Sequence, residues 1–388
     1  MRTQTLNKAV YPELEEYRAE FPILSKKIYL NTVSLGALSR RSIEATQEYL
    51  DIWAARGASA WYDTWMGKLQ ALRAQFARLI GAGPHEIALA PSVSVALSAI
   101  ASSLDYSKRK KVVLTDLDFP TDVYQWQVKA RQGVRVQLLP TDDRIRIPLE
   151  RFERAIDRET ALVVTGRVFF TSGYIQDVKR IAEMAHAKGA HVFIDDYQGT
   201  GQLLLDVKEA DMDFLVSGGL KWLLGGPGIA FLYVREELIE QLEPTITGWF
   251  GAANQFDFDV HHFEFRHDAG RFELGTPALA PIYAASAGLE IIEEIGPGAI
   301  RERSRWLTTD LIERARERGW RLRTAEREEE RAAIVMIEMD DPARVVKELA
   351  QQGIIVDYRP GALRVSPYFY NTIEENEAVI NAIESALR

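Results

Sequence analysis

Short apolar strands alternate with helical segments through the middle of the chain, and this alternation restricts the possible folds more than any other feature. The β-branched, apolar runs lie at residues 111–116, 135–140, 161–165 and 191–195. Between the last two, apolar residues recur at helical spacing: Val178, Ile181, Ala182 and Ala185. Strands that alternate with helices form a mostly parallel, doubly wound sheet with helices on both faces. We therefore predict an α/β fold whose ligands bind at the carboxyl ends of the strands.

A second, smaller unit is predicted at the C-terminal end. Residues 277–296 have the pattern of one long helix, and the strands and helices that follow are typical of an α+β unit. Thr372 and Glu375 form a capping box that opens the last helix. A chain of 388 residues suffices for one large and one small domain. The predicted boundaries are an N-terminal arm over 1–28, a large cofactor-binding domain over 29–290 and a small domain over 291–388.

Composition excludes several classes of function. A net charge of −9 argues against nucleic acid as a partner, because such binding depends on basic patches. No apolar run is long enough for a membrane span and no signal peptide is evident, so a cytoplasmic location is expected. The chain has no cysteine, which excludes disulfides and thiolate metal sites, and its six histidines lack a metal-binding spacing. We expect no metal site.

Lys221 lies in an unusual setting, between the apolar runs "DFLVS" and "GIAFLYV" and among glycines. The runs predict two buried strands, so Lys221 is placed on the turn between them. Glycines there allow the backbone to approach a neighbour closely. A buried lysine has a lowered pKa and becomes a nucleophilic amine. The alternative is a lysine that extends from a hairpin turn into solvent.

A carboxylate at a strand end completes a recognisable pair. Asp195 ends the strand "HVFID", and Asp196 and Gln198 follow it. Pyridoxal phosphate needs a lysine for its Schiff base and an acid beside its ring nitrogen. Ser92 and Ser94 open a predicted helix whose free N–H groups favour a phosphate. Ordinary helix capping by these serines is the alternative.

Several motifs, in order, resemble the class V branch of fold type I pyridoxal phosphate enzymes, and kynureninase most of all. The motifs are "YLNTVSLGALS" (29–39), "FPTD" (119–122), "GWFG" (248–251), "ELGTP" (273–277) and "VDYRPGALRVSPYFYN" (356–371). The resemblance extends from residue 29 to about residue 385. It implies a large domain with a smaller C-terminal domain, and pyridoxal 5′-phosphate as the cofactor.

The resemblance also implies roles for particular residues. Lys221 would form the Schiff base and carry the α-proton, while Asp195 would pair with the ring nitrogen. The other implied cofactor-binding residues are Val93, Ser94, Phe119, Asp122, Thr165, Gln198, Trp249 and Thr276. Thr276 would reach the phosphate across a homodimer interface. Arg364 would bind the substrate carboxylate, with Asn31 on the substrate side; a structural salt bridge from Arg364 to Asp357 or Glu374 is the alternative.

Departures from kynureninase bear on the reaction. Gln198 replaces the histidine of that family's "DxxH", and Leu220 replaces a tyrosine before the lysine. A cysteine desulfurase is excluded, because it carries sulfur on its own cysteine. The resemblance favours a kynureninase-like lyase or hydrolase that cleaves a C–C or C–S bond in the side chain of a small amino acid. A class V aminotransferase is the alternative, and a non-catalytic binding protein on the same fold is a third reading.

Overall fold

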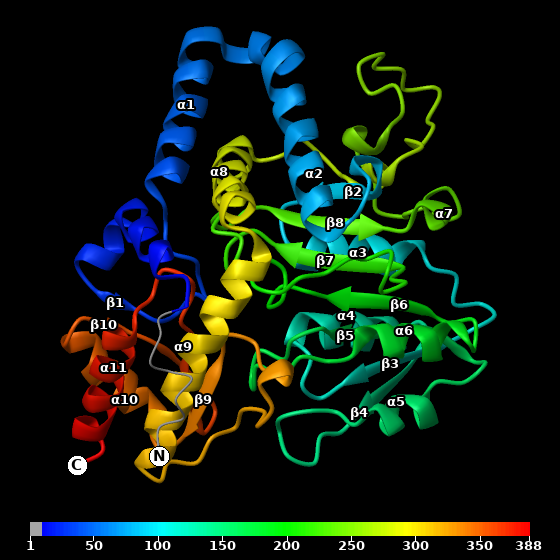
Figure 1. The fold of residues 1–388 in the computed structure, drawn as a ribbon. Coiled ribbons are helices and arrows are strands. Elements are labelled where there is room, and N and C mark those ends of the chain that lie inside the picture. The colour runs from blue at the N-terminus through cyan, green and yellow to red at the C-terminus, as the bar shows by residue number, and fades with distance from the viewer. Residues whose placement is uncertain (1–9) are drawn as a thin grey trace.

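The computed structural model describes residues 10–388, so the first nine residues of the predicted N-terminal arm lie outside the described part. A seven-stranded sheet forms the centre, in the order β2-β8-β7-β6-β5-β3-β4 (Figure 1). Its strands are β2 (Ile87–Ala90), β3 (Lys111–Thr115), β4 (Arg135–Leu139), β5 (Thr160–Gly166), β6 (His191–Asp195), β7 (Phe214–Gly218) and β8 (Ala230–Val234). Strands β3 to β7 pair in parallel, and only β8 runs antiparallel to its neighbours β2 and β7. The predicted mostly parallel sheet is confirmed.

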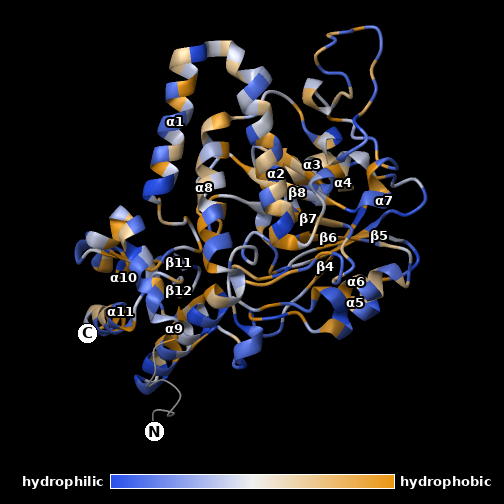
Figure 2. Ribbon diagram, turned by 45° about the horizontal axis from the view of Figure 1, so that its top comes forward, coloured by the Kyte–Doolittle hydropathy of each residue, from blue (hydrophilic) through white to orange (hydrophobic). Residues whose placement is uncertain are grey.

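Helices cover both faces of this sheet, because its strands are apolar on both sides (Figure 2). Along β5, Val163 packs into one core cluster, whereas Leu162 and Val164 pack into the other. The first cluster includes side chains of α2 (Met66–Ile80), α5 (Leu149–Ala155), α6 (Val178–His186) and α8 (Leu279–Ile295). The second includes side chains of α3 (Val93–Ser103) and α4 (Pro120–Ala130).

The C-terminal part contains two smaller sheets. Strands β9 (Val335–Glu338), β11 (Asp357–Arg359) and β12 (Ala362–Val365) form an antiparallel sheet, and β1 (Ile28–Tyr29) pairs in parallel with β10 (Ile354–Ile355). Around them pack α9 (Pro297–Glu317), α10 (Pro342–Gln351) and α11 (Ile373–Ala386). The capping box of Thr372 and Glu375 opens α11, as predicted. Residue 290, the predicted domain boundary, falls inside α8, and the boundaries stay a prediction.

The sequence analysis did not identify six helices of the described chain, namely α1 (Arg40–Arg56), α2, α4, α5, α7 (Glu236–Ile239) and α9. Two of them, α1 and α2, stand on either side of α8 (Figure 1). Within α1 only Ser42 is buried, whereas Leu50 and Trp53 are exposed. Another, α9, begins directly after α8, because Gly296, at φ 82°, ends α8 and Pro297 opens α9. The helix α7 is a single turn.

An early segment, residues 28–37, joins the two parts of the molecule. Its strand β1 pairs with β10, and the amide of Ser366 donates to the carbonyl of Leu30. At its other end, the amide of Gly36 donates to the carbonyl of Leu220 at 2.8 Å. A Cβ on Gly36 would lie 2.2 Å from the carbonyl oxygen of Lys221, so only glycine permits this approach.

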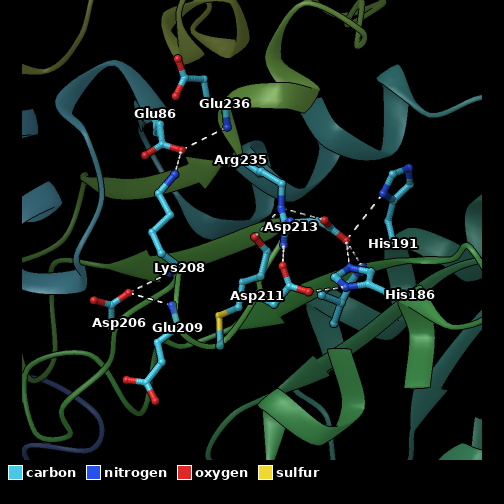
Figure 3. A network of polar contacts seen from close by, with 12 residues as sticks. Glu86, His186, His191, Asp206, Lys208, Glu209, Asp211, Asp213, Arg235 and Glu236 are labelled. Carbon is cyan, nitrogen blue, oxygen red and sulfur yellow. Dashed lines mark hydrogen bonds and ion pairs between the residues drawn. The ribbon is translucent and has the colours of Figure 1, made fainter. Parts of the chain in front are cut away.

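A polar network closes the opposite edge of the sheet, where β6 and β7 begin and β8 ends (Figure 3). His186, the last residue of α6, lies 2.9 Å from Asp211 and 2.8 Å from Asp213 through its two ring nitrogens. Both contacts are hydrogen bonds to carboxylates only if both nitrogens carry protons. The hydrogen bond to Asp213 accordingly raises the pKa of His186. Arg235 pairs with the same two carboxylates.

No helix among residues 10–388 has the length and apolar character needed to cross a membrane.

Candidate active site

The two residues predicted to be catalytic meet at the carboxyl edge of the large sheet. Asp195 is the last residue of β6, and Lys221 follows β7 on the connection to β8, as the flanking apolar runs predicted. Both line one small cavity, together with Phe119 and Gln198. Sequence reasoning missed Tyr197 and Phe170, which also line it. The cavity therefore brings together four of the predicted site residues from three different loops.

Lys221 is half-buried and has no hydrogen-bonded anion among residues 10–388, and its amine lies over two aromatic rings. Its Nζ is 4.1 Å from the ring centre of Tyr197 and 5.7 Å from that of Phe119. Burial lowers the pKa of Lys221 to about 7, opposed by the negative charge of Asp195 and assisted by Arg364 and Arg359. A neutral amine is therefore abundant at neutral pH, which a nucleophile for an aldehyde requires.

The neighbouring aspartates point to different surroundings. Asp195 lines the cavity and accepts a hydrogen bond from the amide of Tyr197 at 2.8 Å. Asp196 is fully buried and pairs with Arg167 through two bonds of 2.7 and 2.8 Å, while it also accepts from the hydroxyl of Thr200. Alternation at a strand end thus directs Asp195 to the cavity and Asp196 into a structural ion pair.

Three buried carboxyl groups lie close together, and two of them, Asp118 and Asp195, line the cavity. Burial raises the pKa of Asp122, and the charges of Asp195 and Asp118 raise it further. Both carboxyl oxygens of Asp122 lack a hydrogen-bond partner among residues 10–388. Asp118, which sequence reasoning missed although it precedes "FPTD", accepts from the amides of Thr115 and Gly166. Burial raises the pKa of Asp118 to about 7.

Gln198 is held by hydrogen bonds on both sides of its amide. Its oxygen accepts from the indole of Trp222 at 2.8 Å, and its nitrogen donates to the carbonyl of Val33 at 3.3 Å. The amide is therefore fixed in orientation at the cavity wall. Leu220 at the kynureninase tyrosine position is half-buried and provides no hydroxyl.

Two helix N-termini meet beside the cavity. Ser92 caps α3, accepting from the amide of Val95, so ordinary capping describes this serine. Ser94 is exposed, and its hydroxyl lies 3.3 Å from that of Thr121 in the first turn of α4. Val93 opens α3 and is buried. The two hydroxyls and the free amides of the helix starts form a cradle suited to a phosphate.

Three predicted cofactor residues are not brought to this cavity. Thr165 is fully buried, and its hydroxyl donates to Asp118 and accepts from Gln176. Trp249 lines a separate open cavity formed by the loop at residues 247–264, and Thr276 is exposed. Their cofactor roles stay a prediction.

Arg364 forms the salt bridge that the sequence left as an alternative. Its Nη2 donates to Asp357 at 2.7 Å and to Ser34 at 2.8 Å, and its Nη1 donates to the carbonyl of Phe170. The register of the β11–β12 hairpin places Asp357 directly opposite Arg364. The side chain is fully buried, and only its Nε lacks a partner among the described residues. A role in holding the substrate carboxylate stays a prediction, as does that of Asn31, whose buried Oδ1 is also unpartnered.

The residues present fit pyridoxal phosphate. A lysine amine of lowered pKa, a carboxylate at a strand end and a phenylalanine at the wall are the groups that its ring requires. The cradle at Ser94 provides polar groups for the phosphate. Together with the mostly parallel sheet, this arrangement is the fold type I scaffold of pyridoxal phosphate enzymes.

Comparison with known proteins identifies the family. The model of the class V aminotransferase family matches residues 28–379, and the chain belongs to this family. An uncharacterized aminotransferase of Bacillus subtilis, YcbU, is 38% identical over 95% of this chain and 97% of its own length. The kynureninase of Bacillus anthracis is 30% identical over 94% of this chain and 89% of its own. Membership of this family indicates pyridoxal 5′-phosphate as the cofactor, as predicted.

Solved structures show the same fold. A cysteine desulfurase from Thermococcus onnurineus superposes with a TM-score of 0.87 at 26% identity, covering 96% of this chain and 97% of its own. A cystine C–S lyase has a TM-score of 0.87 at 20% identity. The predicted fold class is therefore confirmed.

The lowered pKa of Lys221 makes labelling at this residue depend on pH. We expect pyridoxal phosphate and borohydride to label Lys221 at a rate that increases up to about pH 7 and then levels. Labelling of exposed lysines should continue to increase toward pH 10, because they remain protonated longer. Peptide mapping across this pH range measures both. Labelling mainly at another lysine would contradict the assignment.

The two adjacent aspartates should separate catalysis from stability. Asp195→Asn is expected to lower turnover about 100-fold or more, because a preorganised charge at the cavity is lost. Asp196→Asn should instead cost roughly 3 kcal/mol of unfolding free energy, because it leaves the buried Arg167 without its partner. Kinetics and denaturant unfolding of both variants test this. The opposite ranking of the two variants would refute the placement of Asp195.

Proposed function

We propose that the protein cleaves a C–C or C–S bond in the side chain of a small amino acid, as a lyase or hydrolase similar to kynureninase. One observation supports this proposal most: a proton acceptor, Lys221, and a proton donor, Tyr197, lie next to one another at the cavity. The amine of Lys221 is largely neutral near pH 7 and can accept a proton. The phenol of Tyr197 has a pKa raised by burial and by the charge of Asp195, so it stays protonated and can donate.

Each residue has a defined task in this reaction. Bound pyridoxal phosphate supplies the electron sink for bonds at the α-carbon of the amino acid. Lys221 removes the α-proton, and Tyr197, whose ring centre is 4.1 Å from Nζ, is the proton donor. When a C–S bond breaks, the proton goes to the departing sulfur. When a C–C bond breaks, water adds to the carbonyl beside that bond, the fragment leaves as a carboxylic acid, and the proton goes to the β-carbon. Asp195 stabilises positive charge at the ring nitrogen. Phe119 and Phe170, 5.2 Å apart, exclude water from one wall.

Transamination is the second candidate, and Gln198 favours it. This residue and Leu220 replace the histidine and tyrosine of kynureninases, and the relative YcbU carries the name aminotransferase. Transamination needs a keto acid as amino acceptor, whereas side-chain cleavage needs none. Sulfur transfer to a cysteine of this chain is excluded, because the chain has none.

Product analysis decides between the two reactions. We expect amino acids incubated with the enzyme to release alanine, pyruvate or ammonia without any added keto acid. Tyr197→Phe should lower this release by roughly 100-fold or more, because the general acid is lost. The same variant should still exchange the substrate α-proton with deuterium from solvent, which NMR detects. Product that appears only with an added keto acid would establish transamination and overturn the proposal.

We also propose that the enzyme is a homodimer. The loop at residues 247–264 stands away from the large sheet and exposes a set of apolar side chains, namely Trp249, Phe256, Phe258, Val260 and Phe263. Tyr62 adds to this surface, with its ring centre 5.9 Å from that of Phe256. Apolar surfaces of this kind mark protein interfaces, and twofold symmetry is the commonest arrangement. A partner at this surface would cover Trp249 and approach Thr276.

Charge on the apolar loop should split the dimer. Phe258→Asp with Val260→Asp is expected to convert the protein to a monomer in sedimentation and to reduce its affinity for pyridoxal phosphate. Leu387→Asp, an equivalent change near the C-terminus and far from the loop, is the control and should remain dimeric. A fully active monomer in either the native protein or the double variant would refute the proposal.

A further inference from the structure

A second arginine lies beside the cavity and has no part in the proposed reaction. Arg359 ends β11, and its guanidinium lies 5.7 Å from the ring centre of Phe170, a residue of the cavity wall. Its positive charge contributes to lowering the pKa of Lys221, which places it within electrostatic reach of the amine. Arg359 is therefore on the substrate side of the cavity.

Arg359 and Arg364 differ in what they can offer a ligand. The side chain of Arg364 is 1% exposed and all but its Nε is engaged by protein groups. The side chain of Arg359 is 27% exposed. Its Nη1 donates to Asp357 and to the carbonyl of Tyr358, while its Nε and Nη2 have no partner among residues 10–388. Arg359 thus retains a face of its guanidinium for an anion.

The charges around Arg359 leave an excess of cations. One oxygen of Asp357 accepts from Arg359 at 2.8 Å and from Arg364 at 2.7 Å, so a single carboxylate serves two guanidinium groups. Pro360 follows Arg359 in the chain, and its carbonyl accepts hydrogen bonds from Arg144 and Arg323. Of these two, Arg323 has a carboxylate within 4 Å, that of Glu338 at 3.9 Å. A clustered excess of arginines attracts anions to this side of the cavity.

We propose that Arg359 binds a second acidic group of the substrate, so that the enzyme acts on an amino acid whose side chain carries a carboxylate or a similar anion. This inference rests on the proposed function for the chemistry at the α-carbon. Arg364 would offer the α-carboxylate its positive charge and its one free group, Nε. Arg359 would hold the side-chain anion beside Phe170 through its free Nε and Nη2. A neutral side chain would leave the free face of Arg359 without a partner.

Binding of dicarboxylates tests the inference without any turnover. Glutarate and pentanoate have the same number of carbon atoms but carry two and one carboxylates, and neither has an amino group to react. We expect calorimetry on the holoenzyme to show glutarate binding at least 10-fold more tightly than pentanoate, since hydrogen bonds to charged groups are the strong ones. A failure of the proposed reaction would leave this measurement unaffected.

Variants assign the preference to Arg359. Arg359→Gln should remove most of the preference for glutarate while changing pentanoate affinity less than about 2-fold. Arg359→Lys keeps the charge but lacks the planar fork, so its preference should be intermediate. Arg78→Gln removes an exposed arginine of α2 that pairs with Glu293 and does not line the cavity, and it should leave the preference intact.

Three outcomes would overturn the inference. Equal binding of both acids by the native enzyme would show that no second anion site exists. If Arg359→Gln weakens the binding of glutarate and pentanoate equally, Arg359 binds the carboxylate that both acids share. A preference that survives Arg359→Gln would place the second site elsewhere. If turnover is found, the ratio of kcat/KM for L-glutamate over L-glutamine should fall at least 10-fold in Arg359→Gln and stay constant in Arg78→Gln.

Discussion

Burial lowers the pKa of the Lys221 amine to about 7, and the charged groups around the amine adjust this pKa further. Asp195 favours the charged form, whereas Arg364 and Arg359 favour the neutral one. The amine is held by aromatic faces rather than by a hydrogen-bonded carboxylate, so it keeps its lone pair for chemistry. The arginines can take this position only because Asp357 neutralises part of their charge. The pKa of Lys221 therefore depends on the charges of both arginines and of Asp195.

The fold brings these groups together by placing each at the end of a regular element. Asp195 ends β6, Lys221 follows β7, and Phe119 precedes α4. All strands of the large sheet except β8 run in the same direction, so their carboxyl ends lie at the same edge of the sheet. The hairpin of β11 and β12 approaches the same edge from the C-terminal part and contributes Asp357, Arg359 and Arg364. The sheets thus fix the positions of the cavity residues, which lie at the strand ends or on the short loops that follow the strands.

The parallel sheet and the position of Lys221 could be predicted, because the alternation of strands with helices and the apolar runs around Lys221 are features of the local sequence. Asp195 and Gln198 reached the cavity for the same reason. The ion pair of Arg364 with Asp357 could have been derived from the hairpin, since the Pro360–Gly361 turn sets Asp357 opposite Arg364. Tyr197 and Asp118 carry no motif, and only their burial in three dimensions distinguishes them. Trp249 and Thr276 do not line the cavity, and their cofactor roles stay a prediction. The helix α1 was missed because its exposed apolar face lacks the usual one-sided pattern.

The segment at residues 28–37 also affects the order in which the molecule can be assembled. Its partners in the β1–β10 pairing and at Ser366 are among the last residues of the chain, more than 300 positions later. A chain emerging from the ribosome can form its large sheet first, because those strands and helices are neighbours in sequence. The hydrogen bonds of Ser34 to Arg364 and of Val33 to Ser366 form only after the later residue has been synthesised. Until then Val33, which accepts from Gln198, is not fixed in place. The cavity wall is therefore complete only after residues 354–366 have been synthesised, because residues 28–34 depend on them for pairing.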